Sequence, residues 1–280
     1  MTLKAYRTHF YKELEALYPQ EEYETFFKFL VQENLKLAAY EIPLNFQLKL
    51  DEAQRNLFDK ALSRLQQNEP LQYIVASTEF YGFPFQLSPA VLIPRPETEE
   101  LVDWIYTDFK NTSCTILDIG TGSGAIAVSL AKLLPEAKVT AIDVSEDALK
   151  IAEANASSNA VNVQFIKQDI LDCQALDRSY DVIVSNPPYV RDLEKVEIKA
   201  NVLNYEPHLA LFVEDQNALI FYKKIAELAI KALQPNGILY FEINQYLSAE
   251  TVSLLKNIGF SQVELRYDFA GKPRMIKAQR

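Results

Sequence analysis

Hydrophobic residues along the first 70 positions recur at the three- and four-residue spacing of one helix face. This spacing predicts three helices: two separated by Pro19, and a third that starts near Asp51 and ends before Pro70. The apolar positions are Tyr6, Phe10, Leu14 and Leu17, then Tyr23, Phe26, Phe27, Leu30 and Leu37, then Leu57, Leu62 and Leu65. We therefore expect a small helical domain over residues 1–72. It carries no catalytic constellation, which favours a role in docking a substrate.

The pattern changes to alternation over residues 73–96, where a glycine at position 82 predicts a turn. The aromatic residues around this turn are Phe80, Phe83 and Phe85. Their alternation predicts a β-hairpin, which we expect to act as a linker between domains. Pro96 then suits the first position of a new helix, with acidic residues in its first turn.

The remaining chain, residues 97–280, alternates strand-like and helix-like segments. Strands are expected near 115–119, 138–142, 161–166, 180–185, 237–243, 259–267 and 272–278, and helices near 125–133, 216–233 and 247–257. Such alternation predicts an α/β domain with a mostly parallel sheet that helices cover on both faces. The last two strands flank a short turn at Gly271, so they should form an antiparallel pair at one edge.

Length and composition narrow the function classes. At 280 residues the chain exceeds the roughly 250 at which single cores tend to split, so two domains are expected. The net charge of −10 argues against stable binding of long nucleic acids. The two cysteines, Cys114 and Cys173, form no CxxC motif, so we expect neither a disulfide framework nor a metal site. We read no signal peptide or membrane span, and we expect a cytoplasmic protein that does not bind membranes.

A glycine-rich loop follows the strand expected at 115–119. Its residues are Gly120, Thr121, Gly122, Ser123 and Gly124. Glycines at this place let backbone amides approach a ligand at a helix amino terminus. Asp143 lies 23 positions after Gly120, close to the spacing at which an acid binds ribose hydroxyls. Together these features predict a cofactor that contains adenosine.

The glycine spacing indicates which kind of cofactor. It departs from the GxGxxG pattern of dinucleotide-binding loops, and Asp118 precedes the loop by two positions. A carboxylate there suits a cofactor with an ammonium group and disfavours a pyrophosphate. Asp169 and Ile170, after the third strand, could bond to and sandwich an adenine ring.

A stiff loop ends the strand at 180–185 and carries Asn186, Pro187, Pro188 and Tyr189. The Asn186 side chain and the carbonyl of Pro187 can accept hydrogen bonds from a planar NH2 group, which Tyr189 could cover with its ring. A proline-terminated strand with a capping asparagine is the structural alternative. Arg95, between two prolines, could pair locally or line the same site as a substrate contact.

These motifs resemble known enzymes. LDIGTGSGAIA resembles motif I of class I S-adenosylmethionine-dependent methyltransferases, and SNPPY resembles their amino-methylating motif. The series PLQYI, EFYGFPF, LIPRPETEELV, SNPPYV and NYEPHLAL resembles the HemK/PrmC family, the peptide chain release factor glutamine methyltransferases. The resemblance runs from about Pro70 to the carboxyl terminus. One departure is Ala76, where many members of the family have glycine.

The resemblance implies a Rossmann-like methyltransferase domain that methylates the glutamine of the GGQ motif in release factors. Residues 120–124, Asp143, Asp169 and Ile170 would bind S-adenosylmethionine, with Asn186 at the boundary between cofactor and substrate. Asn186 through Tyr189 would receive the glutamine, with Asn186, Pro187 and Tyr189 as the catalytic residues. Other possible substrates are a glutamine of a ribosomal protein and an adenine of nucleic acid. A non-catalytic binding module is the more distant alternative.

Overall fold

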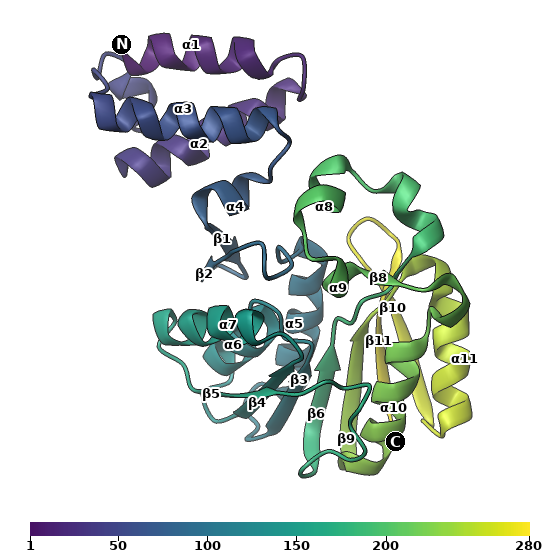
Figure 1. Cartoon of the computed structure of the whole chain (residues 1–280). Coiled ribbons are helices and arrows are strands. Elements are labelled where there is room, and N and C mark those ends of the chain that lie inside the picture. Colours follow the sequence, from purple (N-terminus) through teal and green to yellow (C-terminus); the bar gives the residue numbers. More distant parts are fainter. The chain divides into compact units, whose positions relative to one another are not determined.

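The computed structural model describes residues 1–280, which form two compact units (Figure 1). The first comprises Met1–Ala76 and Lys199–Tyr205, and the second comprises Ser77–Ile198 and Glu206–Arg280. The expected domains of 1–72 and 97–280 with a linker at 73–96 differ from this division in two respects. The hairpin belongs to the second unit, and a short segment near residue 200 joins the first.

The first unit is helical, as expected from the apolar spacing. Its helices are α1 (Leu3–Leu14), α2 (Gln20–Leu35), α3 (Glu52–Gln66), α4 (Leu71–Val75) and α8 (Ala200–Tyr205), with a 3-10 turn at Pro43–Asn45. Phe10, Phe27 and Phe58 are fully buried in its core. Asp51 caps α3 in a reciprocal capping box with Gln54, which explains why the helix begins there. Helix α4 lies in the segment that was expected to be only hairpin and linker.

The hairpin consists of β1 (Ser77–Phe80) and β2 (Phe83–Gln86), joined by a tight turn as expected. Tyr81 and Gly82 both have positive φ, at 51° and 75°, which is typical of a two-residue hairpin turn. Phe80 and Phe85 are 1% exposed and pack into the core of the second unit. This burial is the physical reason that the hairpin is part of that unit and not a free linker.

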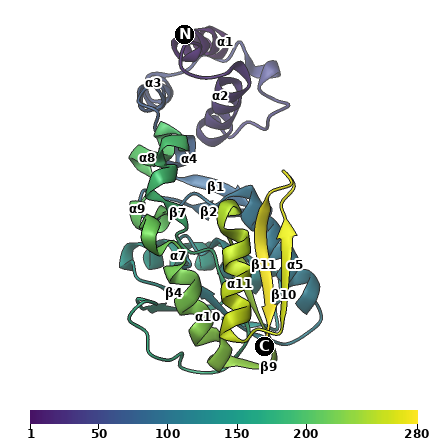
Figure 2. The ribbon, with the colours of Figure 1, turned by 90° about the vertical axis from the view of Figure 1, so that its right-hand side faces the viewer.

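The second unit is built on a seven-stranded sheet with the order β10-β11-β9-β6-β3-β4-β5. The strands are β3 (Thr115–Ile119), β4 (Lys138–Asp143), β5 (Val163–Lys167), β6 (Tyr180–Ser185), β9 (Leu233–Glu242), β10 (Gln262–Tyr267) and β11 (Pro273–Gln279). Five strands are parallel, and β11 pairs antiparallel with both β9 and β10. The antiparallel strands at this edge are visible in Figure 2. The expected mostly parallel sheet with an antiparallel edge is therefore confirmed.

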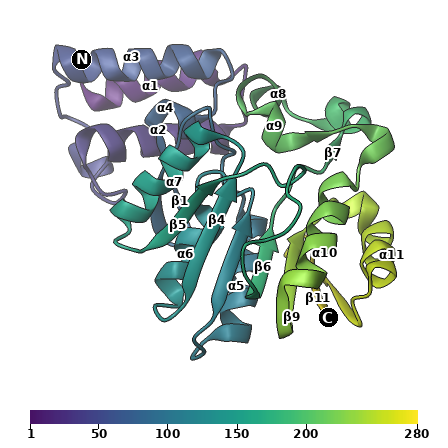
Figure 3. The same cartoon turned by 60° about the horizontal axis from the view of Figure 1, so that its bottom comes forward.

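Helices cover both faces of the sheet, since its central strands are apolar on both sides. One face carries α5 (Pro96–Phe109), α6 (Ala125–Leu133) and α7 (Glu146–Ser158), and the other carries α10 (Ile220–Ala232) and α11 (Ser248–Ile258). Figure 3 shows α10 and α11 next to each other. No helix of the chain is both long and apolar enough to traverse a bilayer.

The segment between β6 and α10 contains short elements that the sequence pattern did not indicate. They are β7 (Val190–Arg191), α9 (His208–Leu211), β8 (Phe212–Val213) and 3-10 turns at Asp192–Glu197 and Asp215–Asn217. A further 3-10 turn, Gln245–Leu247, follows β9. Strands β7 and β8 pair in parallel as a small separate sheet.

The order of the sheet reverses at β3. After β3 the chain runs outward through β4 and β5, then returns to place β6 on the other side of β3. Loops that leave the carboxyl ends of β3 and β6 therefore diverge, which opens a crevice typical of ligand sites in this class of fold.

Candidate functional site

A cavity of about 440 Å³ lies at this crevice, at the carboxyl ends of the parallel strands. Its walls come from the loops that follow β3, β4, β5 and β6, from the segment before α5 and from residues 207–210. Of the predicted site residues, it brings together Arg95, Gly120, Thr121, Gly122, Ser123, Asp143, Asp169, Ile170, Asn186, Pro187 and Pro188. Gly124 and Tyr189 do not line it.

The glycine loop forms one wall with its backbone. Gly120 and Gly122 have positive φ, at 74° and 55°, and a Cβ at either position would meet no atom within 4 Å. The positive φ would strain any side chain at either position. Because both residues line the cavity and carry no side chain, their backbone stays accessible to a ligand. Thr121 and Ser123 also line the cavity and are almost fully buried.

Gly124 has a packing role and does not line the cavity, and its assignment as a cofactor contact stays a prediction. It starts α6 with a φ of 81°, and a Cβ there would lie 3.1 Å from the Cβ of Ala152 in α7. The glycine thus permits close approach of two helices. In the Gly120–Gly124 pattern only the first two glycines border the ligand space.

Asp118 lies beneath the glycine loop and outside the cavity lining, so it does not present its carboxylate directly to a ligand ammonium group as expected. The residue is 0% exposed, and Oδ2 accepts a hydrogen bond of 2.7 Å from the Thr121 hydroxyl. Oδ1 has no hydrogen-bond partner. Burial raises the pKa of Asp118 to about 7.

Asp143 connects the ends of two strands. Its Oδ2 accepts a hydrogen bond of 2.8 Å from the backbone N–H of Gly122, and its Oδ1 accepts one of 2.9 Å from Ser145. Burial raises the pKa of Asp143, and the backbone N–H donors partly oppose that shift. The carboxylate therefore shapes the glycine loop as well as lining the cavity. Its contact with ribose hydroxyls stays a prediction.

Asp169 and Ile170 follow β5 at the same cavity. Oδ1 of Asp169 accepts a hydrogen bond of 2.8 Å from the N–H of Leu171, which orients the exposed carboxylate. Ile170 is 7% exposed and offers an apolar surface. This pairing of a hydrogen-bond acceptor and an apolar side chain suits an adenine ring, and the assignment stays a prediction.

The loop after β6 supplies Asn186, Pro187 and Pro188 to the opposite wall. Nδ2 of Asn186 donates a hydrogen bond of 3.3 Å to the hydroxyl of Thr98 in α5. The amide hydrogens thus face the protein, while the carbonyl oxygen of the side chain has no protein donor. Asn186 is therefore placed to accept a hydrogen bond from a ligand.

Tyr189 does not cover the cavity with its ring, contrary to the expectation from the sequence. Its hydroxyl donates a hydrogen bond of 2.9 Å to Oε1 of Glu242, and its carbonyl accepts one of 2.9 Å from Asn244. Burial and the carboxylate of Glu242 raise the pKa of Tyr189. The residue anchors the end of the loop in the protein, so its role in this structure is support and not stacking.

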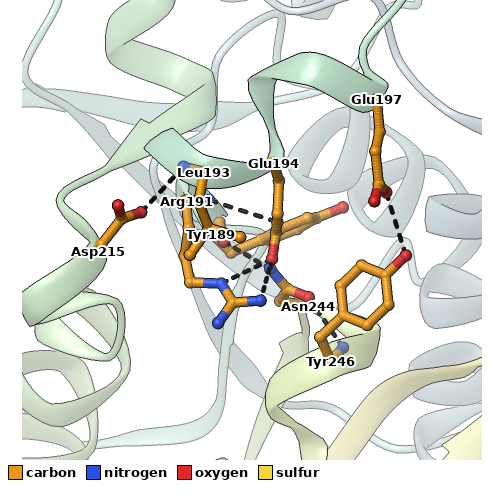
Figure 4. Close-up of polar contacts among 8 residues, drawn as sticks. All are labelled: Tyr189, Arg191, Leu193, Glu194, Glu197, Asp215, Asn244 and Tyr246. Atoms are coloured by element: carbon orange, nitrogen blue, oxygen red, sulfur yellow. Dashed lines mark hydrogen bonds and ion pairs between the residues drawn. The ribbon is translucent and has the colours of Figure 1, made fainter.

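A polar network extends this anchor (Figure 4). Nδ2 of Asn244 donates to both carboxylate oxygens of Glu194, at 3.2 and 2.9 Å, and Glu194 forms an ion pair with Arg191. Glu194 is only 7% exposed, and a buried charge is costly unless it is paired. The guanidinium of Arg191 and the amide of Asn244 supply that pairing. These contacts fix the chain immediately after Tyr189.

Arg95 lines the cavity, but its ion-pair partner lies 111 positions away and not nearby in the sequence, and its contact with a substrate stays a prediction. Its Nη2 lies 2.6 Å from Oε1 of Glu206, whose side chain is 1% exposed. The other oxygen of Glu206 accepts a hydrogen bond of 3.2 Å from the N–H of Ile93. Glu206 thus holds the segment before α5 against the segment that starts at Pro207.

Sequence reasoning missed several residues of the site. Thr98, Glu206 and Glu242 were not singled out, although Thr98 and Glu206 lie in the motifs LIPRPETEELV and NYEPHLAL. For Thr98 and Glu206, their place in these two motifs was the available signal. Pro207, Leu209 and Ala210 also line the cavity.

The cavity suits S-adenosylmethionine on chemical grounds. The open backbone of Gly120 and Gly122 can approach the amino acid part, the Asp143 carboxylate can accept hydrogen bonds from a diol, and Ile170 can contact an aromatic base. Every one of these groups lies on the same cavity as Asn186.

Comparisons with known proteins agree with this site. A family model described as a methyltransferase domain matches residues 110–263, and one described as the PrmC N-terminal domain matches residues 5–75. The release factor glutamine methyltransferase of Flavobacterium psychrophilum is 50% identical over 281 residues, which cover 99% of each chain. That of Bacteroides thetaiotaomicron is 44% identical over 268 residues, which cover 95% of this chain and 96% of the other.

A solved structure shows the same fold. It is the 16S rRNA N2 methyltransferase of T. thermophilus in complex with AdoMet and guanosine. Its TM-score is 0.54 at 18% identity, over 73% of this chain and 49% of that one. Together with the sequence matches over nearly the whole chain, the fold and the site show that this chain belongs to the HemK/PrmC family of release factor glutamine methyltransferases.

Proposed function

We propose that this chain transfers a methyl group from S-adenosylmethionine to the side-chain amide nitrogen of the glutamine in the GGQ motif of peptide chain release factors. The observation that carries the proposal is the placement of Asn186, whose side-chain carbonyl is left for a ligand on the wall of a cavity that suits the methyl donor. The names of the relatives with 50% and 44% identity support the same substrate.

The chemistry requires positioning more than a strong base. An amide nitrogen is a poor nucleophile because its lone pair is delocalised into the carbonyl group. The Asn186 side chain and the Pro187 carbonyl would each accept a hydrogen bond from one substrate N–H, which orients the nitrogen and favours positive charge on it. The N–CH3 bond would form as the S–CH3 bond of the donor breaks, and one of the two N–H protons would then leave to water. Such alignment can contribute about 7–11 kcal/mol to lowering the barrier, and the two acceptors add electrostatic stabilisation.

The cofactor half of the site follows from the same arrangement. S-adenosylmethionine supplies an electrophilic methyl group on a sulfonium. The backbone of Gly120 and Gly122 would bind its amino acid part, Asp143 the ribose hydroxyls, and Asp169 with Ile170 the adenine. Thr121 and Ser123 would complete the wall of the cofactor side of the cavity. Pro188 would keep the substrate side of the cavity narrow.

We assign substrate docking to the helical first unit. Its family model is separate from that of the methyltransferase domain, and it exposes large apolar side chains at Tyr40 and Leu44, which are 76% and 80% exposed. A release factor as substrate places the reaction in the cytoplasm.

The test is methyl transfer from labelled S-adenosylmethionine to purified release factor, with a release factor whose GGQ glutamine is replaced by alanine as the matched control. The proposal expects label only on the native factor. It also expects Asn186→Ala to abolish transfer while S-adenosylmethionine still binds. Label that appears on a ribosomal protein or on nucleic acid, and not on the release factor, would overturn the substrate.

A further inference from the structure

A chain of hydrogen bonds leads from Asn186 through Thr98, which also lines the cavity, to Glu242 in the core. Nδ2 of Asn186 donates to the hydroxyl of Thr98 at 3.3 Å, and that hydroxyl donates to Oε2 of Glu242 at 2.6 Å. Thr98 lies in the first turn of α5 and Glu242 is the last residue of β9. The three residues come from positions separated by 88 and 144 places along the sequence.

The direction of this chain is dictated by the number of hydrogens available. A carboxylate only accepts hydrogen bonds, so the single hydroxyl hydrogen of Thr98 is committed to Glu242. Thr98 can then only accept a bond from its other neighbour. The Asn186 amide must therefore turn its NH2 group toward Thr98, which directs its carbonyl oxygen away from Thr98.

The same carboxylate also holds the other end of the loop. Oε1 of Glu242 accepts the hydroxyl hydrogen of Tyr189 at 2.9 Å, so its two oxygens have different donors. Glu242 is 1% exposed and Thr98 is 4% exposed, which excludes competition from bulk water. The carboxylate of Glu242 thus holds both ends of the stretch from Asn186 to Tyr189, the first through Thr98 and the second directly.

We infer that Thr98 and Glu242 are positioning residues, which set the orientation of the Asn186 side-chain amide so that an oxygen acceptor faces the NH2 group of the substrate. The inference rests on the proposed function and deepens it. An amide rotated by half a turn would present its own NH2 group to the substrate NH2, and two donors cannot bond. The buried pair Thr98 and Glu242 thus decides whether Asn186 presents its oxygen or its NH2 group to the substrate.

The decisive comparison is Thr98→Val against Thr98→Ser. Valine keeps the shape but has no hydroxyl, so Asn186 loses its directing acceptor, whereas serine keeps the hydroxyl. Thr98→Val should lower kcat for methyl transfer by about 10- to 100-fold, the scale of a misplaced reacting group. The Kd of S-adenosylmethionine should stay within about threefold of wild type, and Thr98→Ser should recover most of kcat.

Thr251→Val is a matched control for the loss of a buried threonine hydroxyl. Thr251 in α11 is 0% exposed, and its hydroxyl donates to the carbonyl of Leu247, the residue just before that helix, outside the cavity lining. A purely structural role for Thr98 would give both valine variants the same modest loss of Tm and an unchanged kcat. That outcome, with wild-type protein active on release factor, would overturn the inference. If the wild type itself transferred no methyl group, the proposed function would fail instead.

A second readout does not depend on activity. The side-chain amide hydrogens of Asn186 should exchange with solvent faster in Thr98→Val than in wild type or Thr98→Ser, as measured by NMR on the amide assigned through Asn186→Ala. If Thr98→Val does not fold, Glu242→Gln gives the same test, because its carboxamide leaves only one oxygen for the two hydroxyl donors. Unchanged kcat and unchanged amide exchange in Glu242→Gln would also contradict the inference.

Discussion

The side chain of Asn155 forms two reciprocal hydrogen bonds with the backbone of Gln86, accepting from its N–H at 2.6 Å and donating to its carbonyl at 3.0 Å. Asn155 is in α7, and Gln86 ends β2. The same Nδ2 also donates to the carbonyl of Ser123 in the glycine loop at 2.9 Å. One fully buried side chain therefore connects the hairpin, a helix and the candidate cofactor loop.

Asn155→Ala should lower the free energy of unfolding of the second unit by about 2–4 kcal/mol, because backbone groups of Gln86 and Ser123 lose their partners. It should also weaken S-adenosylmethionine binding, since the glycine loop loses a support. Fluorescence of Trp104, the single tryptophan and a buried residue of α5, reports unfolding of this unit. Asn162→Ala, at an exposed position, is the control and should change neither quantity.

The stability of the free protein should fall as the pH rises from about 4 to about 7, because of Asp118. Its pKa is about 7 in the folded protein and 3.8 without burial. Between these two pKa values the folded state holds a proton on Asp118 that the unfolded state has released. The stability that protonated Asp118 contributes is therefore fully present below pH 3.8 and lost as the pH rises through about 7. Asp118→Asn keeps an acceptor for Thr121 and cannot ionise, so it should flatten this part of the curve.

Urea unfolding followed by Trp104 fluorescence at several pH values between about 4 and 8 measures this effect. Asp172→Asn, at an exposed aspartate, controls for the change in surface charge. A pH dependence that is the same in wild type and Asp118→Asn would contradict the assignment.

Glu206→Ala should raise KM for the release factor with a smaller change in the Kd of S-adenosylmethionine. It removes the ion pair with Arg95 and the bond to Ile93, which hold two segments of the cavity wall together. Because Arg95 is about a third exposed, water relieves part of the loss, and we expect the free energy of unfolding to fall by about 1–3 kcal/mol. Glu264→Ala, which removes an exposed ion pair on β10, should cost less than about 1 kcal/mol.

Ala76→Gly should stabilise the first unit by about 0.5–1 kcal/mol. Ala76 ends α4 with a φ of 55°, in the left-handed region that favours glycine. This conformation gives a physical reason why glycine would suit the position, as the family resemblance implies, and does not account for the alanine found here. Calorimetry should show a higher Tm, whereas Ala61→Gly in the interior of α3 should lower it. A lower Tm for Ala76→Gly would show that the strain is relieved elsewhere.

Replacement of the exposed apolar side chains Tyr40 and Leu44 by serine should raise KM for release factor without changing the Kd of S-adenosylmethionine. This expectation follows from the docking role proposed for the first unit. Phe269→Ser is the control, since Phe269 is 72% exposed on the second unit. Equal KM values for the double variant and wild type would assign docking to another surface.

Much of the architecture follows from the sequence alone, because periodicity and backbone chemistry act locally. Apolar spacing located the three long helices of the first unit, and Pro96 marked a helix start that the structure confirms. The glycine loop, Asp143 and Asn186 were found because each lies at the end of a strand or directly after it, and parallel strands bring their carboxyl ends to one edge.

Only the tertiary structure decided where individual side chains point. Gly124 packs against Ala152, Tyr189 turns to Glu242, and Asp118 lies under its loop, although all three belong to the predicted motifs. The sequence determines which residues sit at the ends of strands, since that depends on neighbours along the chain. Partners such as Thr98 and Glu242, 144 positions apart, meet only when the sheet and its covering helix are assembled.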